Sequence, residues 1–364
     1  MRITYFAVST RLGPSSRYRI YQYQNFFNNH DHRLIIAPAL GDKYFQAERF
    51  QGFSRWWRRL IFFCVGLFRR LLQLRHLCQA DLIIIEREFF AFIPPVFEWL
   101  IHLSRQSYVL ELDDAIYLQN GRRRKYPHLL RMAKAVIVGN ESLANHCLKY
   151  NKNVHVIPTT ISIKRYPKRK HYKHASLARI GWVGLAYNYP HLHTIASALT
   201  EVCRLAPAKL VILSARPEQF AFPYELVMWQ ENKETEIISS FDIGIMPLRD
   251  TAFARGKCGL KLMQYMACGI PSVASPVGVN KQIIKHNENG LLATTADEWR
   301  EALLSLLNDE TLRQRLGQSA RVTIEKKYSL EVWGPRLVRL YEEFYTSPFK
   351  NNKAGATRIL SGVW

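Results

Sequence analysis

The stretch that most constrains the fold of this 364-residue chain is residues 255–292, which opens with the letters RGKCGLKLMQYMACGIPSV. Two glycines and two cations lead into a helical run at 260–267, which ends at Gly269 and Pro271. A glycine-rich loop before a helix N-terminus presents unpaired backbone N–H groups and a partial positive charge, and it lets a ligand approach the backbone closely. The segment therefore predicts an anion site in an α/β domain.

The predicted helix at 260–267 has two distinct faces. Lys257, Lys261 and Gln264 are spaced by four and three residues, which places them on one face. The apolar residues of another face are Leu260, Met263 and Ala267. We expect one face to pack and the other to bind. The apolar runs 272–275 and 291–293, with turn residues between them, predict two short strands after the helix.

The run KLMQYMACGIPSVASPVGVN, followed by NENGLLA, resembles the donor-binding segment of retaining family 4 glycosyltransferases of the GT-B fold. The closest likeness is to a subgroup whose donor loop opens RGKCGxK. The resemblance implies an α/β chain of two Rossmann-like, doubly wound domains facing a central cleft, with a C-terminal helix that crosses back to the first domain. It also implies a nucleotide-sugar donor, no metal and no separate cofactor. The leaving diphosphate would itself help to deprotonate the acceptor, with retention at the anomeric carbon.

Two glutamates eight positions apart flank the donor loop in that family, the first contacting the sugar or phosphate and the second the ribose. The matching positions here are Gly256 and Gln264, so both depart from the family pattern. A glutamine side chain still offers hydrogen bonds to ribose hydroxyls, whereas glycine has no side chain to contact a sugar. The alternative interpretation of Gln264 is a solvated helix residue.

A second departure from the family pattern makes the cations of the donor loop more important. The strand 178–183 and Gly184 resemble the first strand and loop of the family's nucleotide domain, but the Arg and Lys-Gly that usually follow are missing. We therefore expect Arg255, Lys257 and Lys261 to stabilise the charge on the diphosphate as catalytic residues. The other donor contacts expected in this half are Gly184, Gly259, Leu260 and Gln264.

The length of the chain suggests two domains of roughly 150 residues each. We expect an acceptor domain at 1–165 that also takes the C-terminal helix at 329–346, a nucleotide-sugar domain at 174–328, and a tail at 347–364. No stretch of about 20 uncharged apolar residues is present to span a bilayer. The first strand, 3–8, runs directly into polar residues, so no signal peptide is expected. Six cysteines without metal-ligand spacing are typical of reduced thiols in a cytoplasm.

The first strand is followed by the loop LGPSSRYR, which has the position of the first βα turn of a doubly wound sheet. The resemblance places this loop against the donor diphosphate and the acceptor, which makes Gly13, Ser16 and Arg17 donor-binding candidates. The alternative is that Arg17 and Arg19 are solvated residues at a helix start.

Charged residues follow the strands 82–85 and 108–112, at the sheet edge where open α/β folds bind ligands. The residues expected on the acceptor side are Glu86, Arg87, Glu88 and Asp114. Asp113 stands where many family members carry a histidine near the sugar, and it is the fourth catalytic candidate. Asp114 has an alternative structural role as a cap of the following turn. The adjacent pair lacks the Asp-x-Asp spacing of metal-binding glycosyltransferases, so no metal site is expected.

The formal net charge of +22 favours a polyanionic partner, which leaves nucleic acid, phosphate-bearing substrates and an anionic membrane face as candidates. Residues 51–80 contain no acid and place six arginines around Trp56, Trp57 and the apolar run 60–68. This composition is typical of an interfacial membrane helix, with a buried helix and snorkelling arginines as the alternative. We expect a cytoplasmic protein that is peripheral on the inner face of the membrane.

These features lead to one main functional hypothesis and two alternatives. The main one is a retaining, hexosyltransferase-type enzyme that moves a sugar to a hydroxyl of a cell-envelope glycan or lipid-linked precursor. A non-catalytic nucleotide-sugar-binding protein is the first alternative, because both family glutamates are missing. A basic nucleic-acid-binding protein is the second, but the chain carries no nucleic-acid motif, so no nucleic acid is expected as a partner.

Overall fold

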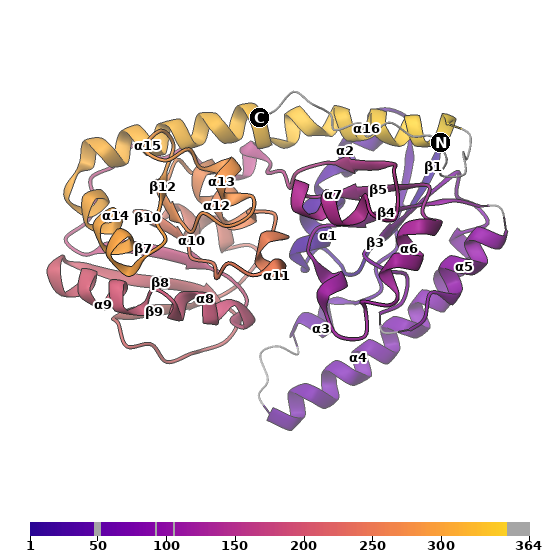
Figure 1. The fold of residues 1–364 in the computed structure, drawn as a ribbon, viewed down its shortest axis with the longest axis horizontal. Coiled ribbons are helices and arrows are strands. Elements are labelled where there is room, and N and C mark those ends of the chain that lie inside the picture. Colours follow the sequence, from indigo (N-terminus) through magenta and orange to yellow (C-terminus); the bar gives the residue numbers. More distant parts are fainter. Residues whose placement is uncertain (47–51, 92, 105, 348–364) are drawn as a thin grey trace. The chain divides into compact units, whose positions relative to one another are not determined.

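The computed structural model describes residues 1–46, 52–91, 93–104 and 106–347, and these form two compact units (Figure 1). Of the described residues, unit 1 takes those within Met1–Thr159, Gly256–Cys258 and 330–347, and unit 2 takes Thr160–Arg255 and Gly259–Ser329. The expected division did not foresee that Gly256–Cys258 would belong to the first unit. The predicted tail at 347–364 lies, apart from Ser347, outside the described residues.

Unit 1 alternates strands with helices. Its elements are β1 (Arg2–Phe6), α1 (Pro14–Arg19), η1 (Tyr21–Tyr23), α2 (Gln24–Asn28), β2 (Arg33–Ile36), α3 (Asp42–Gln46), α4 (Gly52–Leu72), η3 (Gln73–His76), β3 (Leu82–Glu86), α5 (Val96–Leu103), β4 (Tyr108–Leu112), η4 (Ile116–Leu118), α6 (Tyr126–Met132), β5 (Ala135–Val138), α7 (Glu141–Cys147), β6 (Val154–Val156) and α16 (Leu330–Thr346).

The described strands of unit 1 form one parallel sheet in the order β2-β1-β3-β4-β5-β6. The central strands read as nearly continuous apolar runs, and every residue of β3 and β4 is buried. Such runs are typical of parallel strands that are covered on both faces. The order reverses at β1, which places the topological switch point between β1 and β3, the position where doubly wound sheets bind ligands.

The helix predicted near the C-terminus is present as α16 and packs in the core of unit 1. Its side chains Trp333, Leu337 and Tyr341 are buried in the same cluster as Ile3 and Ile84 of the sheet. Phe27 of α2 lies against Tyr341, with 5.2 Å between the ring centroids. The last helix of the described residues therefore completes the first unit, as the GT-B resemblance implies.

Unit 2 repeats the alternation. Its elements are η5 (Ile163–Arg165), β7 (Ala178–Val183), η6 (Ala186–Asn188), α8 (Tyr189–His193), α9 (Ala196–Leu205), β8 (Ala208–Ser214), β9 (Tyr224–Met228), α10 (Glu234–Ser239), β10 (Ile243–Met246), α11 (Ala252–Arg255), α12 (Leu260–Ala267), β11 (Ser272–Ala274), α13 (Asn280–Ile283), β12 (Leu291–Leu292), α14 (Ala296–Asn308), α15 (Glu310–Thr323) and η7 (Ile324–Tyr328).

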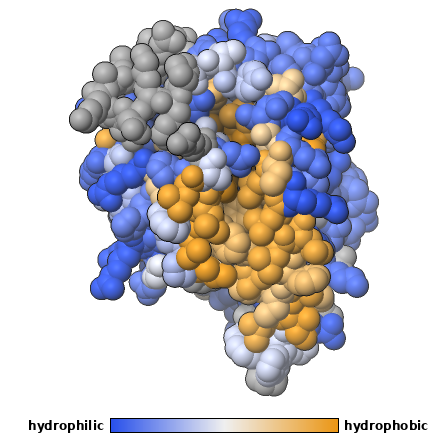
Figure 2. Space-filling model, turned by 90° about the vertical axis from the view of Figure 1, so that its right-hand side faces the viewer, coloured by the Kyte–Doolittle hydropathy of each residue, from blue (hydrophilic) through white to orange (hydrophobic). Residues whose placement is uncertain are grey.

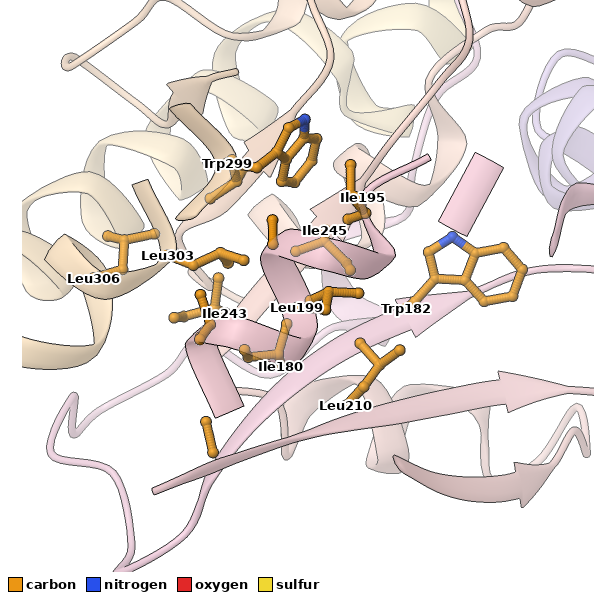
Figure 3. Close-up of a cluster of buried hydrophobic side chains, with 14 of the residues drawn as sticks. Ile180, Trp182, Ile195, Leu199, Leu210, Ile243, Ile245, Trp299, Leu303 and Leu306 are labelled. Atoms are coloured by element: carbon orange, nitrogen blue, oxygen red, sulfur yellow. The ribbon is translucent and has the colours of Figure 1, made fainter. Parts of the chain in front are cut away.

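The sheet of unit 2 is also parallel, in the order β12-β11-β10-β7-β8-β9. Its core is shown in Figure 3, where Trp182 of β7 and Trp299 of α14 lie among branched side chains such as Ile243 and Leu303. A capping box at Thr295 and Glu298 starts α14. The switch point of this sheet lies between β7 and β10. The prediction of two doubly wound α/β halves is confirmed.

Candidate active site

A buried carboxylate organises the switch point of unit 1. Glu86, the last residue of β3, is 1% exposed, and its Oε2 accepts hydrogen bonds from the Val8 N–H at 2.8 Å and the Ser16 hydroxyl at 2.7 Å. The Ser16 Oγ in turn accepts a hydrogen bond from the Ser9 N–H at 3.1 Å. A Cβ at Gly13 would lie 1.9 Å from the Ser9 Oγ. The β1–α1 loop therefore closes around Glu86 only with glycine at position 13.

Burial, reinforced by the charge of Asp113, raises the pKa of Glu86 from 4.5 to about 7. The folded state binds the proton more tightly than the unfolded chain, so this group makes unit 1 less stable as the pH rises from about 4.5 to about 7. We expect Glu86→Gln to remove this pH-dependent loss of stability. The loss is on the order of 3 kcal/mol between the lower and the upper end of that pH range. Urea unfolding at both pH values measures it, with exposed Glu331→Gln as the control. Equal pH dependence in the parent and the Glu86 variant would contradict the assignment.

Next to Glu86, one arginine joins the two adjacent aspartates. The Arg87 Nε donates to the Asp113 Oδ1 at 3.0 Å, and its Nη2 lies 3.4 Å from the Asp114 Oδ2. The same Nη2 donates to the Ser15 hydroxyl at 2.6 Å. Arg87 has a φ of 64°, which is uncommon outside glycine and is a feature of constrained functional segments.

The two aspartates differ in their proton affinity. Burial opposes ionisation of Asp113, but the Arg87 charge and the Ser15 hydroxyl outweigh it and lower the pKa of this carboxyl. Burial and the neighbouring Asp113 raise the pKa of Asp114 to about 6, against the charges of Arg87 and Lys257. Adjacent carboxyl groups with divergent pKa values are a frequent arrangement in acid–base sites. Asp114 is thus able to exchange a proton near neutral pH while Asp113 stays ionised.

The segment Gly256–Cys258 is held beside these aspartates within unit 1. The Asn140 Nδ2 donates to the Gly256 carbonyl at 2.9 Å, while its Oδ1 accepts from the Leu143 N–H and caps α7. The Cys258 thiol donates to the Asp113 carbonyl at 2.9 Å, and burial raises the pKa of this thiol to about 12. Sequence reasoning missed Asn140 and Cys258. Their signals were a Gly-Asn pair directly after strand 135–138 and a cysteine inside the predicted anion loop.

Packing explains why position 256 holds glycine. A Cβ there would lie 2.6 Å from the Ala115 Cβ and 3.1 Å from the Leu143 Cδ2. Separations under 3.0 Å force a neighbour to move, and the Ala115 Cβ is fixed to the backbone. An acidic side chain at this position is therefore incompatible with the packing of unit 1.

Other predicted residues of unit 1 have structural partners. Glu88 is buried and pairs with Arg122 at 2.7 Å and Lys125 at 3.1 Å, so its carboxylate belongs to a separate ion-pair cluster. Arg17 is 4% exposed, with its guanidinium carbon 5.0 Å from the centre of the Tyr18 ring. Arg19 is 3% exposed and pairs with Glu111 at 2.5 Å. The interpretation of both arginines as solvated helix-start residues is wrong.

The switch point of unit 2 brings together a lysine, a tryptophan and a glycine. The Lys261 Nζ lies 4.1 Å from the centre of the Trp182 ring, a cation–π contact. A Cβ at Gly184, the residue after β7, would lie 2.5 Å from that same nitrogen. Glycine at position 184 thus leaves space for the ammonium group at the carboxyl end of β7.

The helix α12 begins at Leu260, directly after Gly259, whose φ of 71° favours glycine. A Cβ at Gly259 would lie 2.4 Å from the Ile283 Cδ1. Lys257 therefore precedes the helix, and its predicted place on one helical face with Lys261 and Gln264 is wrong. Lys257 belongs to the Gly256–Cys258 segment of unit 1.

Most of α12 is buried and anchored. Gln264 is 2% exposed, and its Nε2 donates to the Tyr166 hydroxyl at 3.1 Å, which contradicts the interpretation of a solvated residue. The Tyr265 hydroxyl accepts from the Val183 N–H at 2.9 Å, which ties the helix to the end of β7. Arg255, by contrast, is exposed and makes a bidentate pair with Asp250 at 2.6 and 3.0 Å.

We expect Gln264→Ala to weaken nucleotide binding by about 1 kcal/mol, the usual net worth of one hydrogen bond. Isothermal titration with UDP, GDP and ADP measures the change. Tyr166→Phe is the matched control, because it removes the hydroxyl that Gln264 contacts and leaves the amide in place. If the alanine variant binds all three nucleotides as tightly as the parent, Gln264 does not contact the ribose.

Comparison with known proteins supports an assignment for unit 2. Residues 177–309 match the family model described as "Glycosyl transferases group 1". This part of the chain is therefore similar to a glycosyl transferases group 1 domain. The match includes Gly184, Lys261 and Gln264, and thus the whole of the cluster around Trp182.

One curated relative is N-acetyl-alpha-D-glucosaminyl L-malate synthase of Bacillus anthracis, which is 25% identical over 174 residues, or 44% of this chain and 43% of the relative. The chain therefore spans less than half of the length of this relative.

Two solved structures share the fold of almost the whole chain. Sucrose-phosphate synthase from Thermosynechococcus elongatus has a TM-score of 0.72 at 14% identity and covers 96% of this chain and 100% of its own. HepE from Anabaena, solved in complex with UDP and glucose, has a TM-score of 0.68 at 13% identity, with 94% and 100% covered. The fold is that of GT-B glycosyltransferases.

Proposed function

We propose that the protein is a retaining glycosyltransferase of the hexosyltransferase type that takes its sugar from a nucleotide-sugar. The observation that carries the proposal is the position of Lys261. Its ammonium group lies against Trp182 at the switch point of unit 2, within the residues that match the glycosyl transferases group 1 model. A cation at the carboxyl edge of such a sheet, beside a helix N-terminus, suits a diphosphate.

In this proposal residues of unit 2 hold the donor, and Arg255 and Lys261 of that unit offset the negative charge that grows on the leaving diphosphate. Lys257, which belongs to unit 1, is the third cation proposed for this role. Preorganised charges of this kind often provide the largest part of catalysis. Gly184, Gly259 and Leu260 would contact the donor through their backbone groups. HepE was solved with UDP and glucose, which supports a nucleotide-sugar as the donor. No metal and no separate cofactor are required.

We assign the acceptor to the carboxyl edge of unit 1. Asp113 stays ionised beside Arg87, and Asp114 can exchange a proton near neutral pH, so the pair can hold and orient a hydroxyl group. Glu86 and Ser16 shape the loop next to them, with Gly13 and Arg17 on the same loop. The acceptor would be a hydroxyl of a cell-envelope glycan or a lipid-linked precursor, reached from the cytoplasmic face of the membrane.

The test is transfer by the purified protein. We expect one sugar of a panel of UDP-, GDP- and ADP-linked donors to be transferred, and nuclear magnetic resonance of the product to show the anomeric configuration of the donor. An inverted product would contradict retention. No transfer by a protein that binds its donor would favour the non-catalytic binder, which two observations support: position 256 has no room for a side chain, and Gln264 already contacts Tyr166.

A further inference from the structure

The helix α4 exposes a long apolar stripe although it belongs to a folded unit. Trp56, Ile61 and Phe68 are 56%, 54% and 63% exposed. Their exposed apolar neighbours along the helix are Trp57, Leu60, Val65, Leu71 and Leu72. Spacings of three and four residues put this set on one face of the helix. Large apolar side chains exposed together in this way indicate an interaction surface.

The opposite face of α4 packs on the unit, and its main anchor is an arginine. Arg70 is 1% exposed and donates to the carbonyls of Ala7 at 2.9 Å, Ala37 at 2.7 Å and Phe89 at 3.1 Å. A Cβ at Gly66 would lie 3.2 Å from the Ala39 carbonyl oxygen, so the helix backbone approaches the unit closely there. The usual polarity of a surface helix is thus reversed, since a charged residue holds the helix to the unit and the apolar stripe faces outward.

The helix α5 has the same reversed polarity. Its exposed apolar residues follow the spacing of one helical face and are Val96, Trp99, Leu100 and Leu103. Glu98 and Ile101 lie on the buried side, where the Glu98 carboxylate accepts from the Phe89 N–H at 2.9 Å. Figure 2 shows a broad hydrophobic area on the side of unit 1 where Figure 1 places α4 and α5.

The positive charge around this surface indicates which kind of partner it binds. Residues 51–80 carry no acid, and Arg58 and Arg69, which are eleven residues or about three helical turns apart, lie on one border of the α4 stripe. Tryptophans at the beginning of α4 and within α5 are typical of the membrane–water interface. None of the helices in the described part of the chain combines the length and apolar composition needed to cross a bilayer. A basic border and an apolar centre match the surface of an anionic bilayer.

We propose that α4 and α5 together form a docking surface that inserts their apolar stripes into the headgroup–acyl boundary of an anionic bilayer. Insertion of apolar side chains from both helices, rather than attraction to arginines alone, would hold the protein there. Arg70 is already engaged with backbone carbonyls inside unit 1 and serves the fold. The inference rests on the proposed function only in that it explains access to a lipid-linked acceptor.

Co-sedimentation of the full chain with vesicles tests the proposal. We expect binding to phosphatidylcholine vesicles that contain phosphatidylglycerol, and much weaker binding to phosphatidylcholine alone. The double variants Ile61→Ser/Phe68→Ser on α4 and Trp99→Ser/Leu103→Ser on α5 should each weaken partitioning by at least about tenfold. Leu205→Ser is the matched control, because Leu205 is 51% exposed on unit 2 and should leave binding unchanged.

Several outcomes would overturn the proposal. One is a parent protein that fails to sediment with anionic vesicles at low salt. Another is that both double variants bind the vesicles as the parent does while keeping its circular dichroism spectrum. A dimer that both double variants abolish, seen by light scattering in a parent that ignores vesicles, would assign the surface to a second copy instead. Vesicle binding needs no turnover, so intact binding without sugar transfer would contradict the proposed function alone.

Discussion

Lys261→Met is expected to lower turnover by roughly 10²–10³, the usual effect of removing one group that stabilises developing charge. The Lys261 ammonium lies 4.1 Å from the centre of the Trp182 ring, and a Cβ at Gly184 would lie 2.5 Å from its Nζ, at the carboxyl end of β7. Methionine preserves much of the side chain's length and its apolar contact with the ring, but it removes the charge. Steady-state kinetics with the preferred donor measures the effect.

The matched control for this substitution is Lys209→Met. Lys209 lies near the start of β8, where the amino ends of the strands of the same sheet lie, and pairs with Glu225 at 2.7 Å. Its replacement should leave turnover close to that of the parent. The variant Arg255→Ala probes the same diphosphate assignment through an exposed cation that pairs with Asp250. Unchanged turnover in folded Lys261→Met and Arg255→Ala proteins would dismiss that assignment.

Arg70→Met is expected to destabilise unit 1 by on the order of 3 kcal/mol, because hydrogen bonds from a charged donor to buried carbonyls are each worth about 1.5–3 kcal/mol and are not additive. Burial lowers the pKa of Arg70 to about 9, so the side chain is still charged at neutral pH. Its three carbonyl partners belong to the segments after β1, β2 and β3, so its loss affects the packing of α4 on this part of the sheet.

The measurement is urea unfolding followed by tryptophan fluorescence, since Trp56 and Trp57 lie on the same helix. Arg58→Met is the control, because Arg58 is exposed on α4 and its replacement should change stability by no more than about 0.5 kcal/mol. An Arg70 variant that unfolds at the same urea concentration as the Arg58 variant would show that Arg70 does not anchor the helix.

Much of the fold could be predicted from local sequence. The strands at 82–85, 108–112, 135–138 and 243–246 are short apolar runs that end in turn or charged residues, and such runs specify buried parallel strands. The anion loop was also predictable, because glycines such as Gly259 directly before a helical run indicate a loop that leads into a helix N-terminus. Two peripheral strands, β2 and β9, were missed. Both are only partly buried, so their apolar pattern is weaker than that of central strands.

The roles of individual side chains could not be predicted in the same way. Glu86 and Glu88 are two residues apart at the end of the same strand, yet one organises the switch point and the other pairs with Arg122 and Lys125. The partners that give each glutamate its role come from distant parts of the chain. The same is true of Arg70. It is one of several arginines in a basic helix, and only its contacts in the folded unit show that it anchors the helix.

Titration of the parent protein with UDP, GDP and ADP, followed by thermal unfolding, tests the central claim most directly. We predict that one of them stabilises the protein by about 2.7 kcal/mol at a hundredfold excess over its dissociation constant, and that Lys261→Met binds it more weakly. Failure of all three to raise the melting temperature of the parent at roughly 1 mM, the upper end of usual substrate affinities, would contradict a nucleotide-sugar site in unit 2.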